Sequence, residues 1–404
     1  MTYDLLIGVK VVELAMYAFA PSAAAVLADW GADVVKIVPP YVGDPMSGTP
    51  VAGLPDKDVG VAFLWEQFNR GKRCIGLDVS SDDGHAVLTE LVRDADVFLT
   101  NLLPGARRRF RVDADDLLAV NERLVYARAS AHGDRGPERE TGGFDHTDFW
   151  ARTGIGHGAS QVADEFVPQA GPAFGDVTAG AFMAGGIAAA LLRRQRTGHG
   201  GLVDVSLLSS GLWAFAPAVL ASSLYGVDTI PRMRHADLPN PLVGAYTTRD
   251  GRQIYLAGVQ TGRHFENFCA VIARLDLLED PRFATGEARF AHASECIVEL
   301  DAVFAQRDLQ EWLVRLRELV TPWTVVQTAA EAAADPQVCA NGYLVDVAGP
   351  SGGFPLVASP AQFDELPPTL GAAPEHGQHT EAVLLELGRD WPDIARLKDT
   401  RVIN

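Results

Sequence analysis

Short β-branched runs alternate with helical patterns along the first half of the chain, and this alternation predicts strands and helices in turn. Strand-like runs occupy residues 9–14, 32–38, 74–79, 96–101 and 124–130, and helix-like runs occupy 21–31 and 82–95. A strand–helix–strand order implies a parallel sheet with right-handed crossovers. Ligands on such sheets usually bind beyond the carboxyl ends of the strands. We therefore expect an α/β fold with its site at that edge.

The second half has a different texture. Residues 177–195 predict a helix of small residues, and 201–226 predict a short strand followed by one long apolar helix. From about Gly244 the pattern predicts a hairpin and amphipathic helices, so we place a smaller α+β domain at 227–325. A chain of 404 residues is too long for one ordinary core. The large domain is expected to combine 1–226 with 326–404.

Charge and composition restrict the partners. The chain has 52 acidic and 34 basic residues, giving a formal charge of −18, which disfavours nucleic acid and acidic membranes. We see neither a basic leader nor an uninterrupted apolar run of about 18 residues, so we expect no membrane span. Four widely spaced cysteines favour reduced thiols in the cytoplasm, and no Cys or His spacing suits a metal.

Asp176 is the strongest candidate for chemistry. It is the lone acid in "GPAFGDVTAG" (171–180), directly before the predicted small-residue helix. It can serve as the N-cap of that helix, or as a nucleophile whose negative charge is kept by the helix N-terminus; both roles can hold together. An ionised carboxylate can attack an activated acyl group to form a mixed anhydride. Gly175 would let a bulky substrate approach the attacking oxygen.

Clustered basic residues stand out against the acidic background. The segment "NLLPGARRRFR" follows a strand and contains Arg107, Arg108, Arg109 and Arg111, while "FNRGKRCIGLD" contains Arg70, Lys72 and Arg73. Such groups either form solvated charge runs or bind phosphates, which arginine forks fit well. The turn after the first strand lacks GxGxxG, so it is not a dinucleotide-binding turn. His146 in "FDHTDFWARTG" is either a base or a structural histidine.

Five blocks together resemble the class III CoA-transferases, the CaiB/BaiF family. They run in order over nearly the whole chain: "GVKVVELAMYAFAPSAAAVLADWGADVVKIV", "NRGKRCIGLDV", "DADVFLTNLLPGARRRF", "GDVTAGAFMAGGIAAALLRRQRTGHGGLVDVSLL" and "DPQVCANGYLVDV". The resemblance implies a large Rossmann-like domain, a smaller inserted domain and an interlaced homodimer. It implies that acyl-CoA and a carboxylic acid are the substrates, with no permanently bound cofactor.

The resemblance also implies the roles of individual residues. The family's catalytic aspartate falls on Asp176, which would form an aspartyl anhydride and then an aspartyl-CoA thioester. The implied coenzyme A contacts are Tyr17, Ala18, Phe19, Ala20, Lys72, Arg73, Asn101, Leu102, Ala106 and Arg109. Two features depart from the family pattern: Pro39 stands where some members have a basic residue, and the glycine-rich lid corresponds to 257–265, with only two glycines.

Three other activities stay open. An acyl-CoA racemase or epimerase would pair the aspartate with a histidine, but Phe144 stands at the matching place and His146 two residues later. An acyl-CoA hydrolase would let water intercept the anhydride. A protein that binds coenzyme A without turnover would leave Asp176 unused. The acyl-CoA donor and the acid acceptor are not named by the sequence.

Overall fold

The computed structural model describes residues 3–48, 50–55, 59–349 and 352–404. The chain divides into two compact units: residues 1–160, 165–230 and 336–404 form the first, and 161–164 with 231–335 form the second. The first unit therefore contains both ends of the chain. The main part of the second unit spans residues 231–335, whereas the sequence pattern predicted a small domain at 227–325.

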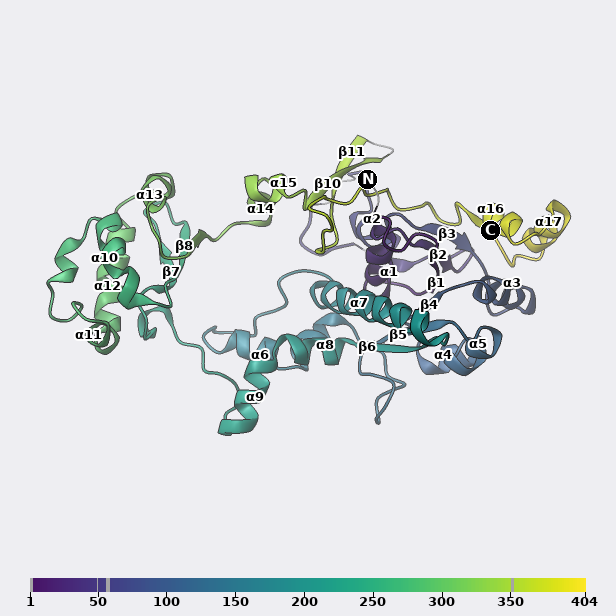
Figure 1. Ribbon diagram of the computed structural model, residues 1–404, viewed down its shortest axis with the longest axis horizontal. Coiled ribbons are helices and arrows are strands. Elements are labelled where there is room, and N and C mark those ends of the chain that lie inside the picture. The colour runs from purple at the N-terminus through teal and green to yellow at the C-terminus, as the bar shows by residue number, and fades with distance from the viewer. Residues whose placement is uncertain (1–2, 49, 56–58, 350–351) are drawn as a thin grey trace. The chain divides into compact units, whose positions relative to one another are not determined.

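The first unit is built on a six-stranded parallel sheet, as the alternating pattern predicted (Figure 1). Its order is β3-β2-β1-β4-β5-β6, the order of a Rossmann-like sheet. Val12 of β1 lies opposite Val35 of β2 on one side and Phe98 of β4 on the other. The strands are β1 (Lys10–Leu14), β2 (Asp33–Val38), β3 (Arg73–Gly76), β4 (Val97–Thr100), β5 (Val125–Ser130) and β6 (Gly201–Ser206).

Helices cover both faces of this sheet, because alternate strand residues point to opposite sides. Val11 belongs to the core with α1 (Phe19–Asp29) and α7 (Phe174–Thr197). Val12 belongs to the core on the other face. The helices on that face are α3 (Asp82–Arg93), α5 (Ala114–Val120), α16 (Thr380–Glu386) and α17 (Trp391–Asp399).

The α7 helix begins at Phe174, earlier than the small-residue pattern indicated. Asp176 is therefore the third residue of the helix, and Ala173 is its N-cap, in a left-handed conformation (φ 61°) and with no side-chain capping bond. The N-cap role considered for Asp176 is wrong. By length and apolar composition α7 could cross a membrane, but its inner face is buried against α1 and the sheet.

The long apolar helix expected after β6 is instead two helices, α8 (Leu207–Ala214) and α9 (Ala216–Tyr225). They are bent by 74° at Phe215. Pro217 in the first turn of α9 lacks the N–H that a continuous helix needs. The bent pair also passes the length and composition test for a membrane span.

Short helices and a hairpin complete the first unit. A π-helical turn covers Asp145–Ala151, and β10 (Leu344–Gly349) pairs antiparallel with β11 (Gly352–Val357). The short helices are α2 (Phe63–Asn69), α4 (Pro104–Arg109), α6 (Ile155–Ser160) and α15 (Pro336–Ala340).

The second unit has its own core around the predicted hairpin, β7 (Val243–Thr247) and β8 (Gln253–Ala257), which β9 (Trp323–Val325) extends. The segment compared with a lid, 257–265, runs from the end of β8 into α10, with Val259 exposed. The helices are α10 (Thr261–Ile272), α11 (Gly286–Ala291), α12 (Ala293–Phe304), α13 (Leu309–Leu316) and α14 (Ala329–Ala333).

Candidate functional site

A pocket of about 230 Å³ opens in the first unit at the carboxyl ends of β4 and β5. Asp176 lines it, together with residues 129–134, which run from the end of β5 into the loop after it. Of the predicted coenzyme A contacts, the pocket brings together Tyr17, Phe19, Asn101 and Leu102. The edge of the sheet at which parallel sheets usually bind ligands therefore carries the candidate nucleophile.

The Asp176 carboxylate is half-buried and uncommitted. Its side chain makes no hydrogen bond to any residue that the structure describes, although its backbone carbonyl accepts one from Ser22. Burial raises the pKa of Asp176 to about 7, and the neighbouring Asp145 carboxylate contributes further. The helix N-terminus favours the charged form of Asp176, as the sequence suggested, but burial and the like charge of Asp145 oppose it and raise the pKa.

Gly175 has a different role from the one expected. A Cβ at this position would lie 2.5 Å from the ring of Phe149. Phe149 is buried and belongs to the π-helical turn 145–151. The space that a Gly175 side chain would take is thus occupied by Phe149, which packs the turn against the start of α7. It is not open to an approaching substrate.

Asp145 lies in the same turn and is buried. Its carboxylate accepts hydrogen bonds from Gln169 Nε2 (2.6 Å) and from the backbone N–H of His146 (2.8 Å). The His146 ring is exposed, 3.9 Å from that carboxylate, and does not line the pocket. This geometry places Asp145, not His146, in the electrostatic environment of Asp176.

The loop after β1 is held in place by Asn101. Its Oδ1 accepts the N–H of Met16 (3.1 Å) and its Nδ2 donates to the carbonyl of Met16 (2.6 Å). The next residue, Tyr17, has φ 67°, a left-handed conformation that is rare for a bulky side chain. Its ring stacks edge-on against Phe144, with centroids 5.6 Å apart. Asn101 therefore acts on this side of the pocket chiefly by fixing the Tyr17 loop.

Lys72 lies in a buried ionic network rather than at the pocket. Its Nζ donates to Glu13 Oε2 (2.7 Å), to the carbonyl of Pro21 (2.9 Å) and to Asn69 (3.1 Å). Glu13 also pairs with Lys36 (2.8 Å), which contacts Asp44 (3.0 Å). These four charged side chains are inaccessible to solvent. The N–H groups of Lys72 are therefore used inside the chain.

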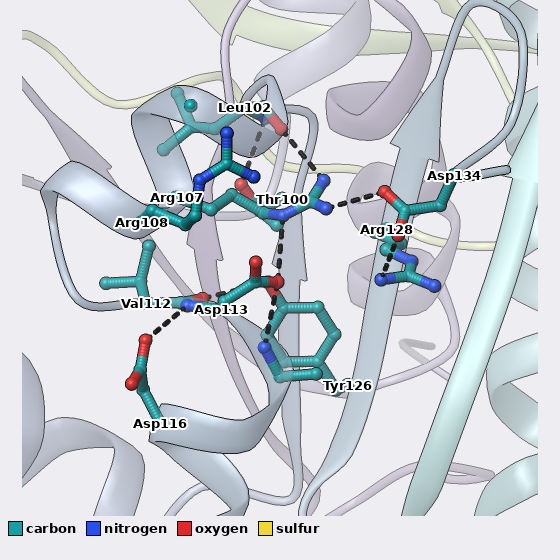
Figure 2. Close-up of polar contacts among 12 residues, drawn as sticks. Thr100, Leu102, Arg107, Arg108, Val112, Asp113, Asp116, Tyr126, Arg128 and Asp134 are labelled. Atoms are coloured by element: carbon teal, nitrogen blue, oxygen red, sulfur yellow. Dashed lines mark hydrogen bonds and ion pairs between the residues drawn. The ribbon is translucent and has the colours of Figure 1, made fainter. Parts of the chain in front are cut away.

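The arginine segment on α4 divides into buried and exposed members. Arg107 is buried and lines the pocket, but its guanidinium is engaged by Asp134 (2.6 Å), Asp113 (3.1 Å) and the carbonyl of Leu102 (3.1 Å), as Figure 2 shows. Arg109 is exposed and stacks over Phe110. Among the described residues it has no carboxylate partner.

The remaining predicted contacts lie outside the lining of the pocket. Ala18 and Ala20 are buried where the Tyr17 loop enters α1, and Ala106 is part of α4. Arg73 on β3 pairs with Asp33 (2.6 Å) and Glu386 (2.7 Å). The sequence patterns could not separate residues that support the pocket from residues that line it.

His132 and Asp148 are site residues that sequence reasoning missed. His132 lines the same pocket as Asp176, and its Nδ1 lies 2.8 Å from Asp148 Oδ1. Asp148 is buried and also accepts from the Thr147 hydroxyl (2.7 Å). A Cβ at Gly143 would lie 1.8 Å from Asp148 Oδ2, so this glycine makes room for the carboxylate. The one available signal was the position of His132 just after a strand.

Comparison with known proteins agrees with this architecture. The profile described as CoA-transferase family III matches residues 6–380. The chain is 33% identical to the (R)-2-hydroxy-4-methylpentanoate CoA-transferase of Clostridioides difficile, covering 99% of both chains. It is 30% identical to the cinnamoyl-CoA:phenyllactate CoA-transferase of Clostridium sporogenes, covering 98% of this chain and 96% of the other.

A solved structure matches as well. The crystal structure of a CaiB/BaiF family protein from Brucella suis has a TM-score of 0.82 and 28% identity, with 96% of this chain and all of the other covered. The mixed α/β fold, the match over nearly the whole sequence and the relatives all agree. The chain belongs to CoA-transferase family III, the CaiB/BaiF family, and is a transferase that uses CoA thioesters.

Proposed function

We propose that the protein moves coenzyme A from an acyl-CoA to a free carboxylic acid, with Asp176 as the covalent nucleophile. The observation that carries this proposal is the state of the Asp176 carboxylate: it lines the pocket and has no hydrogen-bond partner among the described residues. A carboxylate kept only for structure would be paired or capped. An unpaired one retains its lone pairs for attack on an acyl carbon.

The reaction consists of four balanced displacements. An Asp176 oxygen bonds to the thioester carbonyl carbon, and the C–S bond breaks to release the CoA thiolate. The thiolate attacks the Asp176 carbonyl of the mixed anhydride and expels the donor acid as its carboxylate. The acceptor carboxylate then attacks the aspartyl-CoA thioester, forming a second anhydride and releasing the thiolate again. Finally the thiolate attacks the acceptor carbonyl, and Asp176 leaves as a free carboxylate.

The raised pKa of Asp176 suits both halves of this cycle. At a pKa of about 7 the group is substantially ionised near neutral pH, yet it is a stronger nucleophile than an ordinary carboxylate. Burial and Asp145 supply the shift. The first turn of α7 also presents backbone N–H groups that can stabilise a tetrahedral oxyanion.

We assign the coenzyme A contacts in two groups. Tyr17, Phe19, Asn101 and Leu102 line the pocket, and the exposed Arg109 is free to meet a phosphate. Ala18, Ala20, Lys72 and Ala106 support those residues from behind, with Lys72 holding the carbonyl of Pro21 in α1, whereas Arg73 pairs with Asp33 and Glu386 at the start of β3. Binding energy from the remote nucleotide would then position the thioester at Asp176.

We propose a 2-hydroxy acid as one substrate. Two relatives carry such acids in their names, 2-hydroxy-4-methylpentanoate and phenyllactate.

We also propose a cytoplasmic homodimer with interlaced chains. Large apolar side chains are exposed along three consecutive helices of the first unit, a density that marks an interaction surface. They are Phe174, Val177 and Phe182 of α7, Leu212 and Trp213 of α8, and Leu220, Leu224 and Tyr225 of α9.

Isotope exchange tests the proposed activity without knowledge of the natural donor. An acyl-CoA is mixed with its own ¹³C-labelled free acid, and label entering the acyl-CoA is followed by mass spectrometry. A transferase incorporates label. Release of acid and coenzyme A without incorporation would indicate a hydrolase, and deuterium uptake at the α-carbon in heavy water would indicate a racemase. Either result in place of label incorporation would overturn the proposal.

A further inference from the structure

We propose that His132, positioned by Asp148, binds the 2-hydroxyl group of the acyl substrate and so selects 2-hydroxy acids over their unsubstituted counterparts. This inference rests on the proposed transferase function of the Asp176 pocket. It assigns a specificity role to a side chain that the reaction steps at Asp176 do not use.

The His132 side chain is held in a fixed orientation. It is 9% exposed, and its Nδ1 lies 2.8 Å from Oδ1 of Asp148, which is itself buried. The Arg152 guanidinium lies 3.3 Å from the same nitrogen and pairs with Glu138, whose carboxylate is 3.9 Å from it. The other ring nitrogen, Nε2, has no hydrogen-bond partner among the residues that the structure describes.

Two neighbours of opposite kind meet Nδ1 of His132. A carboxylate oxygen of Asp148 lies 2.8 Å away and can only accept, whereas the Arg152 guanidinium lies 3.3 Å away and can only donate. Nε2 is therefore an acceptor when Nδ1 carries the ring proton and a donor when it does not. A hydroxyl group can satisfy either form, because it both donates and accepts.

Most other polar groups of the pocket are already used or lie at its exposed rim. Asn101 is bonded to Met16, and Arg107 is held by its carboxylates. The exposed polar lining residues are Tyr17, Arg139 and Thr141. The Ser130 hydroxyl accepts the N–H of Gly133 (2.9 Å) and keeps its own O–H to donate. His132 and Ser130 thus offer polar atoms to the substrate, and only the His132 nitrogen can serve as either donor or acceptor without losing a bond already made.

The charge of the pocket favours a neutral hydroxyl close to the reacting carbon. C2 of an acyl group held at Asp176 is one bond from the reacting carbon, so it lies in the pocket that His132 also lines. Asp176 lines the pocket without a cation partner among the described residues, and Asp145 and Asp148 lie behind it, whereas Asp134 is paired with Arg107 and Arg128. A second carboxylate on the substrate close to Asp176 would be repelled by it, whereas a hydroxyl would not.

Exchange with a matched pair of acids tests the inference. The pair is 2-hydroxy-4-methylpentanoate and 4-methylpentanoate, each assayed as its acyl-CoA with its labelled free acid. We expect the wild type to prefer the hydroxy acid in kcat/KM by about 10- to 100-fold, because the deoxy acid leaves Nε2 unpaired. His132→Leu should remove that preference by slowing exchange of the hydroxy acid alone, and His132→Gln should restore part of it.

Each outcome has a distinct meaning. Equal loss with both acids in His132→Leu, or no preference in the wild type, would overturn the role of His132 while leaving the transferase function intact. The rate with the deoxy acid also reports whether the variant is folded. Asp148→Asn should weaken the preference less than His132→Leu, because the ring stays while only one of the groups that position it changes. Absence of exchange with either acid in the wild type would overturn the proposed function and this inference together.

Discussion

Glu13 and Asp176 are two buried or half-buried carboxylates near the carboxyl ends of the same sheet, and their surroundings differ in one respect. Glu13 is paired with Lys36 and Lys72, whereas Asp176 has a second acid, Asp145, as its neighbour. Burial alone would raise the pKa of Glu13, but the two ammonium groups outweigh burial and lower it. Burial raises the pKa of Asp176 to about 7 because no cation opposes it.

This difference distinguishes a carboxylate that supports the fold, Glu13, from one that is available for chemistry, Asp176. The compensated network around Glu13 is balanced in charge, and Asp44 of that network also accepts the N–H of Tyr17 (3.2 Å). It therefore holds the strained Tyr17 loop in place. The uncompensated carboxylate of Asp176 stores unfavourable free energy in the folded state, which a covalent or protonated state relieves.

Removal of the Asp176 carboxylate should have the largest effect. Asp176→Ala is expected to reduce isotope exchange by about 10³-fold or more, since no other described carboxylate lies in its place to form the anhydride. The measurement is the steady-state exchange rate, with the exposed Asp115→Ala as a matched control. If the exchange rate of Asp176→Ala stayed within tenfold of the wild-type rate, Asp176 would not be the carboxylate that carries the chemistry.

Removal of the Glu13 charge should be the largest effect on stability. Glu13→Gln leaves two buried ammonium groups with one carboxylate fewer, and breaking such a network costs about 3–5 kcal/mol. Urea unfolding at pH 7 measures the loss, and Glu122→Gln at an exposed position is the control. A loss below about 1 kcal/mol would indicate that the network does not hold this edge of the sheet.

Neutralising Asp176 should have the opposite effect on stability and raise the free energy of unfolding. The pKa of Asp176 is about 7 in the folded protein and near 4 when unfolded, so wild-type stability falls as the pH rises between these values. Asp176→Asn avoids that loss and should be more stable than wild type by about 1–3 kcal/mol at pH 8, allowing for partial solvent screening. The two proteins should be nearly equal at pH 4. If Asp176→Asn were less stable than wild type at pH 8, this would contradict the claim that no cation compensates the Asp176 charge.

The smallest expected effect is a shift of the pH profile when Asp145, the neighbour of Asp176, is replaced. In the wild type, kcat/KM should fall about tenfold per pH unit below pH 7, because the attacking group must be ionised. Asp145→Asn removes the like charge but keeps an acceptor for Gln169, and should move this limb to lower pH by up to about one unit. An unchanged midpoint would mean that burial alone sets the pKa.

The alternation of strands and helices could be predicted from the sequence because it depends on local patterns of residues. β-Branched runs and helical spacing indicated the parallel strands and α3, which Ser81 caps. The two-helix break at Phe215 was missed although Pro217 signalled it, because the apolar run continues across it.

The site was harder to predict because its features arise from residues distant in the sequence. Burial of Lys72 depends on Glu13, and the fit of Gly175 depends on Phe149. In the run Arg107–Arg109, only tertiary contacts distinguish the buried Arg107 from the exposed Arg109. The π-helical turn that carries Asp145 and Asp148 has no pattern that singles it out.

Chemical trapping at Asp176 tests the central claim most directly. The protein is mixed with an acyl-CoA and hydroxylamine, digested and sequenced by mass spectrometry. A covalent anhydride or thioester predicts a hydroxamate on the peptide that contains Asp176, formed only when acyl-CoA is present and absent from Asp176→Asn. Continued exchange with that peptide unmodified, or a hydroxamate on another carboxylate, would contradict the account.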